Sequence, residues 1–351
     1  MQNQIETAKK LIGEGSLLKE EWCGLLAHPE PEVISLLQKE ARRVTDRVFG
    51  RDVYVRGLIE FTNICKQDCF YCGIRKSNSC VSRYRLTGEE ILDCCKEGYE
   101  AGFRTFVLQG GEDGFFTEER LCGIIGKIKD AYPDCALTLS AGEWQRESYQ
   151  RFYDAGADRY LLRQETANEV HYGMLHPKNQ RYSERMRCLA DLKEIGYQVG
   201  CGFLVGSPFQ TVQCIADDLL FLQRFRPQMV GIGPFLPAKN TPFEGEQAGS
   251  SALTLLLLSA IRLMLPEVLL PVTTALGTAR SDGRIQGLLH GANVIMPNLS
   301  PATVREKYAL YDNKIHSGSE AAEHLDALRK ELAKENFTVA ISRGDAPGFA
   351  R

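Results

Sequence analysis

The sequence lacks the features that point to a nucleic acid or a membrane. It has no block of basic residues, and its 42 Lys and Arg against 45 Asp and Glu leave a net charge of −3, whereas surfaces that bind nucleic acids or anionic lipids are basic. Its most apolar stretch, 253–270, is interrupted by polar and charged residues and a proline, and the N-terminus has no apolar signal core. We therefore expect a cytoplasmic protein that acts on small molecules, with no nucleic acid and no membrane as partner.

The sequence also lacks a linker rich in Pro, Gly or Ser and any short repeat, which favours one large catalytic domain within its 351 residues. After an N-terminal helical stretch, short apolar or β-branched runs alternate with longer helical patterns. The eight runs are Val55–Phe61, Thr105–Gln109, Ala136–Ser140, Arg159–Arg163, Gln198–Val205, Met229–Pro234, Pro271–Ala275 and Ala292–Met296. This alternation predicts an α/β fold, a complete (β/α)8 barrel of the TIM type. We expect an N-terminal helical extension at 1–48, the barrel at 49–315, and a C-terminal helix and tail at 316–351.

A fourth cysteine is missing from the run FTNICKQDCFYCG, which holds Cys65, Cys69 and Cys72 at C-x3-C-x2-C spacing. Electron-transfer clusters usually have four thiolate ligands, and zinc sites usually pair two C-x2-C knuckles. Three thiolates on a 4Fe-4S cluster would leave one iron open for a ligand that is not protein. The alternatives are a chance group of structural thiols, drawn from twelve cysteines, or a zinc site that lacks its fourth ligand.

Residues suited to chemistry follow the C-terminal ends of the expected strands. In strand order they are Cys65, Cys69 and Cys72, then Gly110, Gly111 and Glu112, then Ser140, Arg163, Glu165, Gly206, Thr273, Thr274 and Met296. In a parallel barrel these ends meet at one mouth, which is where barrel enzymes keep their active sites. The sequence therefore predicts a single active-site cavity.

The run 58–78, which contains the three cysteines, resembles the signature of the radical S-adenosylmethionine (SAM) superfamily. Six further stretches resemble its biotin-synthase-like branch, and most of all the HydE family of FeFe-hydrogenase maturases: VLQGGED, DRYLLRQETAN, GFLVGSPFQT, MVGIGPFLP, PVTTALGT and GANVIMPNLSP. The resemblance implies a complete barrel, a 4Fe-4S cluster bound by Cys65, Cys69 and Cys72, SAM on the open iron, and an internal cavity for a second substrate. In this superfamily an electron from the cluster cleaves SAM to methionine and a 5′-deoxyadenosyl radical.

The resemblance also implies a SAM site, and several of its residues have a physical account. Gly110 and Gly111 allow the backbone to approach a ligand closely, and Arg163 and Glu165, two apart on a strand, face the same side. The full set is Tyr71, Gly110, Gly111, Glu112, Ser140, Arg163, Glu165, Arg185, Gly202 and Gly206, with Glu112 on the SAM amino group, Arg185 on its carboxylate and the last two glycines beside the adenine. The alternatives are a glycine turn beside a solvated acid, a salt-bridge cluster, and glycines at strand bulges.

A second set of residues is implied to line the substrate region. It comprises Gln109, Arg159, Thr273, Thr274, Met296, Tyr308 and Tyr311. Hydroxyls, phenols and a guanidinium in an otherwise apolar barrel suit a small anionic or iron-bound ligand. For Tyr311, packing against a helix is an equal alternative.

The stretch 314–328, KIHSGSEAAEHLDAL, departs from several relatives, which carry cysteines for an auxiliary cluster after the last barrel strand. Here His316 and His324 fall where two of those cysteines would be. Two histidines without a third ligand are more often surface residues than a metal site, so no auxiliary cluster is expected. This absence also weakens an assignment as biotin synthase, whose sulfur comes from such a cluster.

The resemblance implies an enzyme that uses the deoxyadenosyl radical on a small iron-bound, cysteine-containing precursor of the FeFe-hydrogenase active site. Its expected partners are a reducing electron donor and two other maturases, a tyrosine-cleaving radical SAM enzyme and a GTPase scaffold. Two alternatives stay open. One is an amino-acid mutase like 3-methylornithine synthase, and the other is a non-catalytic iron–sulfur scaffold.

Overall fold

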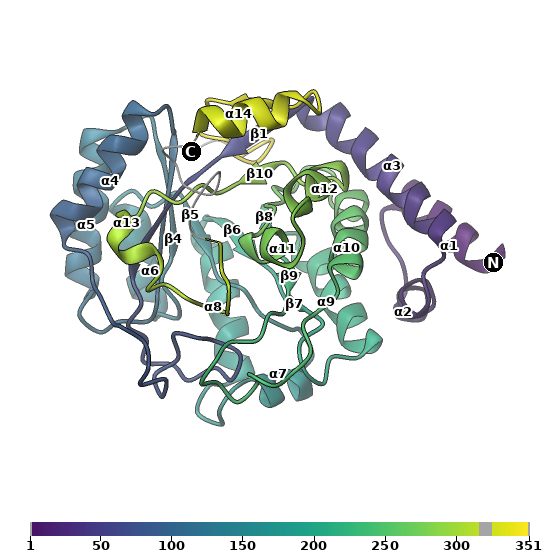
Figure 1. The fold of residues 1–351 in the computed structure, drawn as a ribbon, viewed down its shortest axis with the longest axis horizontal. Helices are drawn as coiled ribbons and strands as arrows, with labels where there is room; N and C mark the ends of the chain where they lie inside the picture. The colour runs from purple at the N-terminus through teal and green to yellow at the C-terminus, as the bar shows by residue number, and fades with distance from the viewer. Residues whose placement is uncertain (1, 316–324, 350–351) are drawn as a thin grey trace.

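The N-terminal region is helical in the computed structural model, which describes residues 2–315 and 325–349. Figure 1 shows three helices along one side of the molecule: α1 (Gln2–Glu14), α2 (Lys19–Ala27) and α3 (Pro31–Phe49). The first amides of a helix have no partner within it, so proline at the start of α3 costs no hydrogen bond. Trp22 of α2 and Leu37 of α3 are fully buried in the main core. The expected helical stretch is present, and the domain bounds stay a prediction.

A parallel sheet occupies the centre of the molecule. Its strands pair in the order β2 (Gly57–Thr62), β3 (Thr105–Gly110), β4 (Ala136–Ser140), β5 (Arg159–Leu161), β6 (Gln198–Cys201) and β8 (Met229–Val230). Single parallel bridges carry the pairing past β8, through β10 (Val294–Ile295) and back to β2: Met229 with Leu269, Pro271 with Val294, and Asn298 with Leu58. These single bridges lead from the last strands back towards β2, and the expected α/β fold with a parallel sheet is confirmed.

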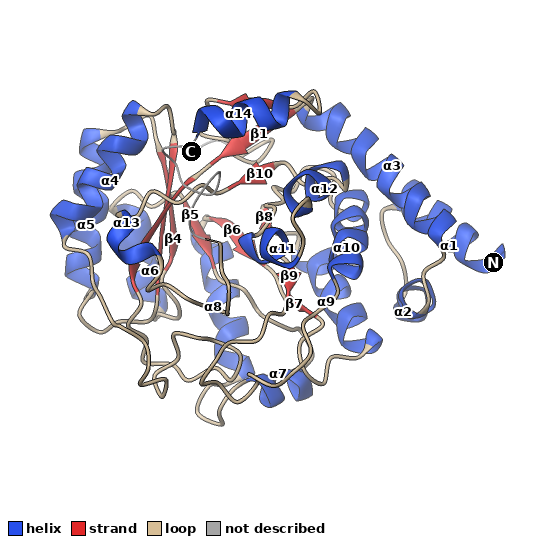
Figure 2. Cartoon of the chain, in the orientation of Figure 1, coloured by secondary structure: helices blue, strands red, loops and turns tan. Residues whose placement is uncertain are grey.

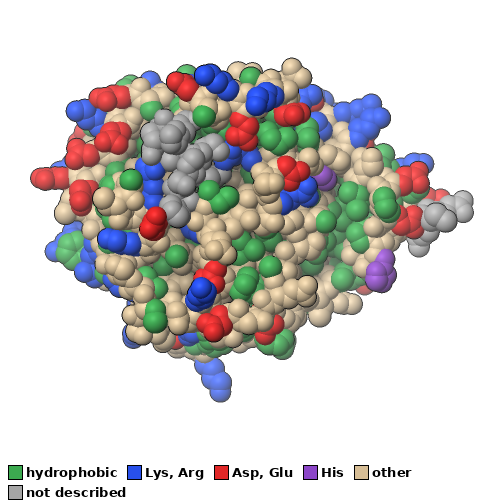
Figure 3. Space-filling model, viewed as in Figure 1, with side chains coloured by type: hydrophobic (Ala, Val, Ile, Leu, Met, Phe, Trp, Pro, Cys, Tyr) green, Lys and Arg blue, Asp and Glu red, His purple; other side chains and the backbone are tan. Residues whose placement is uncertain are grey.

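The helices surround these strands, as Figure 2 shows. The longer ones are α4 (Gly88–Glu100), α5 (Glu118–Ala131), α8 (Tyr182–Ile195), α9 (Val212–Phe225) and α10 (Ser251–Met264). The shorter elements are α6 (Arg146–Asp154), α7 (Glu169–Leu175), β7 (Leu204–Val205), β9 (Gly233–Pro234), α11 (Thr274–Ala279), α12 (Gly283–Leu289), α13 (Ala302–Arg305) and α14 (Leu325–Ala333). Helix α10 is buried almost all round, which accounts for the apolar stretch at 253–270. Within residues 2–315 and 325–349, no helix is both long and apolar enough to cross a membrane. Basic and acidic side chains are interspersed on the face in Figure 3.

The prediction of a seventh strand at Pro271–Ala275 is wrong for the second half of that run. Thr273 has extended backbone angles, but Thr274 already begins α11. The pairing is reduced to the bridges at Leu269 and Pro271 and a hydrogen bond from the Val272 amide to the Val294 carbonyl, 2.9 Å long. A run of small and β-branched residues favours a strand locally, yet here the chain leaves the sheet after Val272.

The C-terminal residues close the end of the barrel where the strands begin. β1 (Asp52–Val55) lies between β10 and β11 (Thr338–Ala340) in a separate three-stranded sheet. Beyond β11, Asp345 Oδ1 lies 2.6 Å from Arg159 Nη2 at the start of β5. Although burial alone would raise it, the charges of Arg159 and Arg343 lower the pKa of Asp345 to about 2. Arg159 is fully buried in this closure, at the opposite end of its strand from the expected cavity.

Candidate active site

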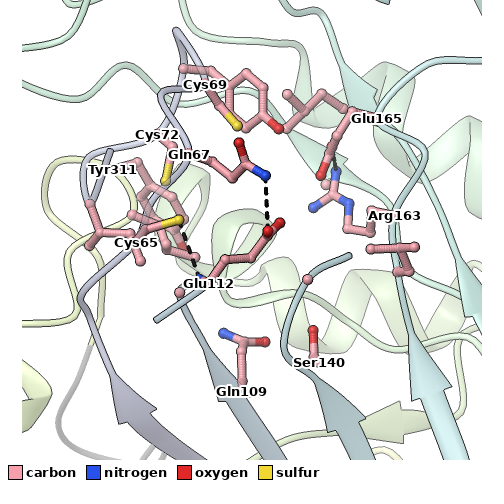
Figure 4. A pocket seen from close by; sticks show the side chains of 18 of the residues that line it. Cys65, Gln67, Cys69, Cys72, Gln109, Glu112, Ser140, Arg163, Glu165 and Tyr311 are labelled. Atoms are coloured by element: carbon pink, nitrogen blue, oxygen red, sulfur yellow. Dashed lines mark hydrogen bonds and ion pairs between the residues drawn. The ribbon is translucent and has the colours of Figure 1, made fainter. Parts of the chain in front are cut away.

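The cysteine run forms a loop between β2 and α4 that three other parts of the barrel hold in place. The Lys66 amide donates to the Glu112 carbonyl at 2.9 Å, after β3. The Phe70 amide donates to the Leu175 carbonyl at 3.0 Å, at the end of α7, and the Gly73 amide donates to Leu310 at 2.8 Å. Figure 4 shows the three cysteine sulfurs on one side of a cavity, facing Arg163 and Glu165 across it. The barrel therefore fixes the loop that carries the three thiols.

The loop fits a cluster with three thiolate ligands. Among the described residues, no three His, Cys, Asp or Glu side chains converge on a point where one metal ion would bind. A 4Fe-4S cluster needs no such point, because each thiolate binds a different iron. Burial raises the pKa of Cys69 to about 11 and raises that of Cys72 still further. These thiols are therefore protonated at neutral pH, and binding of iron would displace the protons to solvent.

Close backbone approach next to the loop requires glycine. A Cβ atom on Gly111 would lie 2.3 Å from the Ile64 carbonyl oxygen and 2.8 Å from Cys65 Cβ, so no larger residue fits. The next residue, Glu112, directs its amide at Cys65 Sγ, 3.4 Å away. The Gly-Gly-Glu turn after β3 thus packs directly against the first cysteine.

The cavity measures about 290 Å³ and opens at the C-terminal ends of the strands. The expected residues that line it are Cys65, Cys69, Tyr71, Cys72, Gln109, Gly110, Gly111, Glu112, Ser140, Arg163, Glu165, Arg185, Tyr308 and Tyr311. The other lining residues are Gln67, Ile74, Gly142, Leu161, Leu162, Gln180, Leu204, Gly233, Pro234, Phe235, Leu236, Ala275 and Leu310. A polar rim beside the thiols therefore meets a largely apolar wall supplied by the later strands.

Glu112 points into this cavity with its side chain only 9% exposed. Gln67 Nε2 donates to Glu112 Oε2 at 2.9 Å, and Lys66 Nζ lies 3.3 Å from the same oxygen. Burial and the nearby charge of Glu143 raise the pKa of Glu112. A cationic group in the cavity would relieve both effects, so Glu112 is a suitable acceptor for an ammonium group.

Arg163 and Glu165 form a second polar pair, past the end of β5. Arg163 Nη2 lies 3.0 Å from Glu165 Oε2, but neither atom has a partner in hydrogen-bond geometry although both are buried. Glu165 also has a φ of +65°, an unfavourable angle for a residue other than glycine. Unused hydrogen-bonding atoms and a strained backbone are typical of a site that awaits a polar ligand.

Arg185 reaches the cavity from α8 and is fixed by two bonds. Its Nε donates to Glu143 Oε1 at 2.6 Å, and its Nη1 donates to the Arg163 carbonyl at 2.5 Å. Burial alone would lower its pKa, but Tyr172 and Glu143 raise it well above its usual value. Arg185 therefore stays charged and can bind a carboxylate.

The structure places six expected residues outside the cavity lining. They are Gly202, Gly206, Arg159, Thr273, Thr274 and Met296. The two glycines have positive φ angles of +149° and +71°, and a Cβ on Gly202 would lie 1.9 Å from the Gly231 carbonyl oxygen. Met296 packs with the cluster of Phe49, Met229, Leu269, Val294 and Ala346, and the Thr273 hydroxyl donates to the Ile232 carbonyl at 3.2 Å. His316 and His324 lie outside the described residues.

Sequence reasoning missed several residues that line or support the site. Gln67 stands between two of the cysteines, so its position could have been noticed. Gln180, in the connection between α7 and α8, and Glu143, three residues past β4, belong to no stretch of recognisable pattern. Only the folded structure shows that Gln180 lies beside Cys69 and that Glu143 binds Arg185.

Known proteins resemble this chain over most of its length. Residues 59–222 match the Radical SAM superfamily. The chain is 44% identical over 284 residues to the FeFe hydrogenase maturase subunit HydE of Thermotoga maritima, covering 81% of this chain and 80% of that protein. It is 31% identical over 293 residues to 3-methylornithine synthase of Methanosarcina barkeri, covering 83% and 82%. The crystal structure of methylornithine synthase (PylB) superposes with a TM-score of 0.84 at 28% identity, covering 95% of this chain and 97% of that one.

Proposed function

The chain belongs to the radical SAM superfamily, in the branch that includes HydE, and from this membership we propose that it is a maturase of the FeFe-hydrogenase active site. The observation that carries the proposal is the 44% identity to HydE over four fifths of both chains. The superfamily uses a 4Fe-4S cluster and SAM. The three-thiol loop beside a polar-rimmed cavity supports the same cofactors in this chain.

In the proposed site each group of residues has one task. Cys65, Cys69 and Cys72 hold the cluster, which supplies the electron that cleaves SAM to methionine and a 5′-deoxyadenosyl radical. Glu112 accepts the SAM amino group and Arg185 binds its carboxylate, while Tyr71, Gly110, Gly111 and Ser140 complete that side of the site. Arg163 and Glu165, whose buried polar atoms lack hydrogen-bond partners, bind the remaining part of SAM.

The substrate is proposed to enter the part of the cavity bounded by the apolar wall. Gln109, Tyr308 and Tyr311 supply its polar contacts, and Leu161 and Leu204 exclude water. We propose that this lining of an amide and two phenols beside apolar side chains receives a small anionic or iron-bound, cysteine-containing precursor, although Arg159, Thr273 and Thr274 lie outside it. The reaction would take place in the cytoplasm, where the twelve cysteines, none of them in a disulfide, stay reduced. The partners would be an electron donor, a tyrosine-cleaving radical SAM maturase and a GTPase scaffold.

Anaerobic maturation of an FeFe-hydrogenase tests the function. With both partner maturases, SAM and a reductant present, adding this protein is expected to restore hydrogen evolution that is absent when it is omitted. The Cys80→Ala variant is a matched control, because Cys80 is exposed and does not line the cavity. Hydrogenase activity that does not depend on this protein would contradict the proposal.

The mutase is the second candidate, favoured by the 31% identity to 3-methylornithine synthase and the TM-score of 0.84. Incubation of the reduced protein with SAM and lysine separates the two functions, because only the mutase would produce 3-methylornithine. A non-catalytic scaffold would release no 5′-deoxyadenosine in either assay.

Replacing Glu112 with glutamine is expected to weaken SAM binding by about 1.5–3 kcal/mol, because it removes a charge-assisted hydrogen bond to the amino group and keeps the shape of the side chain. Equilibrium binding of SAM to the reconstituted protein measures the effect. Glu119→Gln, an exposed acid on α5, serves as the control. Equal affinity in the Glu112 variant and the wild type would remove Glu112 from the SAM site.

A further inference from the structure

The connection between α7 and α8, residues 176–181, forms a second wall against the cysteine loop. His176 Nδ1 donates to the Tyr172 carbonyl at 3.0 Å, which leaves Nε2 free to accept from the Tyr71 hydroxyl at 3.2 Å. Burial, with a smaller contribution from the charge of Arg185, lowers the pKa of His176 to about 3 and keeps the ring neutral. Tyr71, the residue before Cys72, is therefore held by the neutral imidazole of His176.

Gln180 makes the next contact along this wall and is only 7% exposed. Its Oε1 accepts from the Asp68 amide at 3.4 Å, and its Nε2 lies 3.3 Å from Cys69 Sγ. The Gln180 amide in turn donates to the Pro177 carbonyl at 2.9 Å, which fixes the turn that carries the side chain. The Cys69 thiol can also donate to Gln180 Oε1, 3.7 Å away. A thiolate has no proton to donate, so only the N–H end of the carboxamide can bind the sulfur of a bound cluster.

We propose that Gln180 donates an N–H···S hydrogen bond to the Cys69 thiolate of the bound cluster and raises the reduction potential of that cluster. One-electron reduction adds a negative charge that is shared with the thiolates. A donor to the sulfur stabilises the reduced state more than the oxidised state, so reduction becomes easier. Gln180 acts through Cys69 and is a positioning residue that exchanges neither an electron nor a proton.

This inference requires the cluster and does not require a particular substrate. It assigns a function to a residue that belongs to no motif, on a segment far from the cysteines in sequence. Because a redox titration without SAM or substrate reads it directly, failure of the maturation proposal would leave its test intact.

The test replaces Gln180 by methionine, which has a similar length but no hydrogen-bond donor. A second variant has asparagine there, which keeps the amide on a side chain one methylene shorter. Asn179→Ala, an exposed neighbour in the same connection, is the matched control. Each protein is reconstituted anaerobically, its iron is counted, and the reduced cluster is measured by electron paramagnetic resonance during titration with a low-potential chemical reductant.

Both Gln180 variants are expected to keep the wild-type iron content and to have a more negative potential. At the wild-type midpoint, the ratio of reduced to oxidised cluster should fall about three- to tenfold, and tenfold corresponds to about 59 mV for a one-electron couple. Asn179→Ala should titrate like the wild type. SAM cleavage in the Gln180 variants should be slow with a weak reductant and recover with a stronger one.

Three outcomes would overturn the proposal. One is an unchanged potential in a Gln180 variant that holds its iron. Another is an equal shift in the Asn179 control. The third is failure of both Gln180 variants to bind iron, which would show that the residue is needed to assemble the site rather than to set its potential.

Discussion

Replacing Cys69 with alanine is expected to abolish both the iron–sulfur cluster and the cleavage of SAM. The wild-type protein should bind about four irons per chain after anaerobic reconstitution, with three of them held by thiolates. Cys69 lines the cavity between the other two cysteines along the loop. Without it, two irons would lack a protein ligand, and the remaining pair of thiolates could not exclude solvent from the cluster. Iron and sulfide content, together with 5′-deoxyadenosine release, measure the loss.

The Cys80→Ala variant separates this effect from a general loss of thiols. Cys80 lies on the same long loop, between β2 and α4, but it is exposed and outside the cavity. It should keep full iron content and full SAM cleavage. A Cys69 variant that still cleaves SAM, or a wild-type protein with about eight irons, would mean that the ligands or the number of clusters had been assigned wrongly.

Replacing Lys314 with methionine is expected to destabilise the protein by about 3–5 kcal/mol, because it leaves a buried carboxylate without its cation. Glu60, on the inner face of β2, is fully buried and forms an ion pair with Lys314, which is itself only 8% exposed. Lys314 Nζ also donates to the Tyr308 carbonyl at 2.9 Å, so it holds a segment that lines the cavity. Urea unfolding measures the change in free energy.

The double variant Glu60→Gln with Lys314→Met tests the cause of this loss. Removing both charges should recover a large part of the stability, because no unpaired charge then remains buried. Lys239→Met, at an exposed position, should unfold like the wild type. A double variant as unstable as Lys314→Met alone would mean that packing of the lysine stem, and not its charge, stabilises the barrel.

The parts of the site that were predicted from sequence depend on local chemistry. Three closely spaced cysteines, and a Gly-Gly-Glu turn at the end of β3, indicate the same chemistry wherever the fold places them. The pattern of β2 to β6 was readable for the same reason, since short runs rich in apolar or β-branched residues alternate with helical patterns, one of which starts with the capping box of Thr87 and Glu90. These local signals located the cavity and most of its polar rim.

The errors arose where a position depends on pairing between distant segments. Arg159 was expected in the cavity because the family resemblance implied it. It lies at the start of its strand, however, and inward side chains at the two ends of a strand face opposite openings of a barrel. The ion pair with Asp345, far along the sequence, holds the Arg159 side chain at the opening where the strands begin. Gln180 was missed for a similar reason, because only the fold brings the α7–α8 connection to Cys69.

The position of β1 between β10 and β11 bears on how the protein is made. Synthesis releases β1 long before its two partners, β10 and β11, because both lie far along the sequence from it. Contacts between segments that are distant in sequence also form slowly, because a large loop must close first. The opening lined by Arg159 therefore stays unsealed until β11 and Asp345 have been synthesised, and a chain that terminates before β11 lacks both a strand of this sheet and the acid that neutralises that arginine. Termination of synthesis before β11 should accordingly yield a protein that is degraded, even though every cysteine of the catalytic loop has been translated.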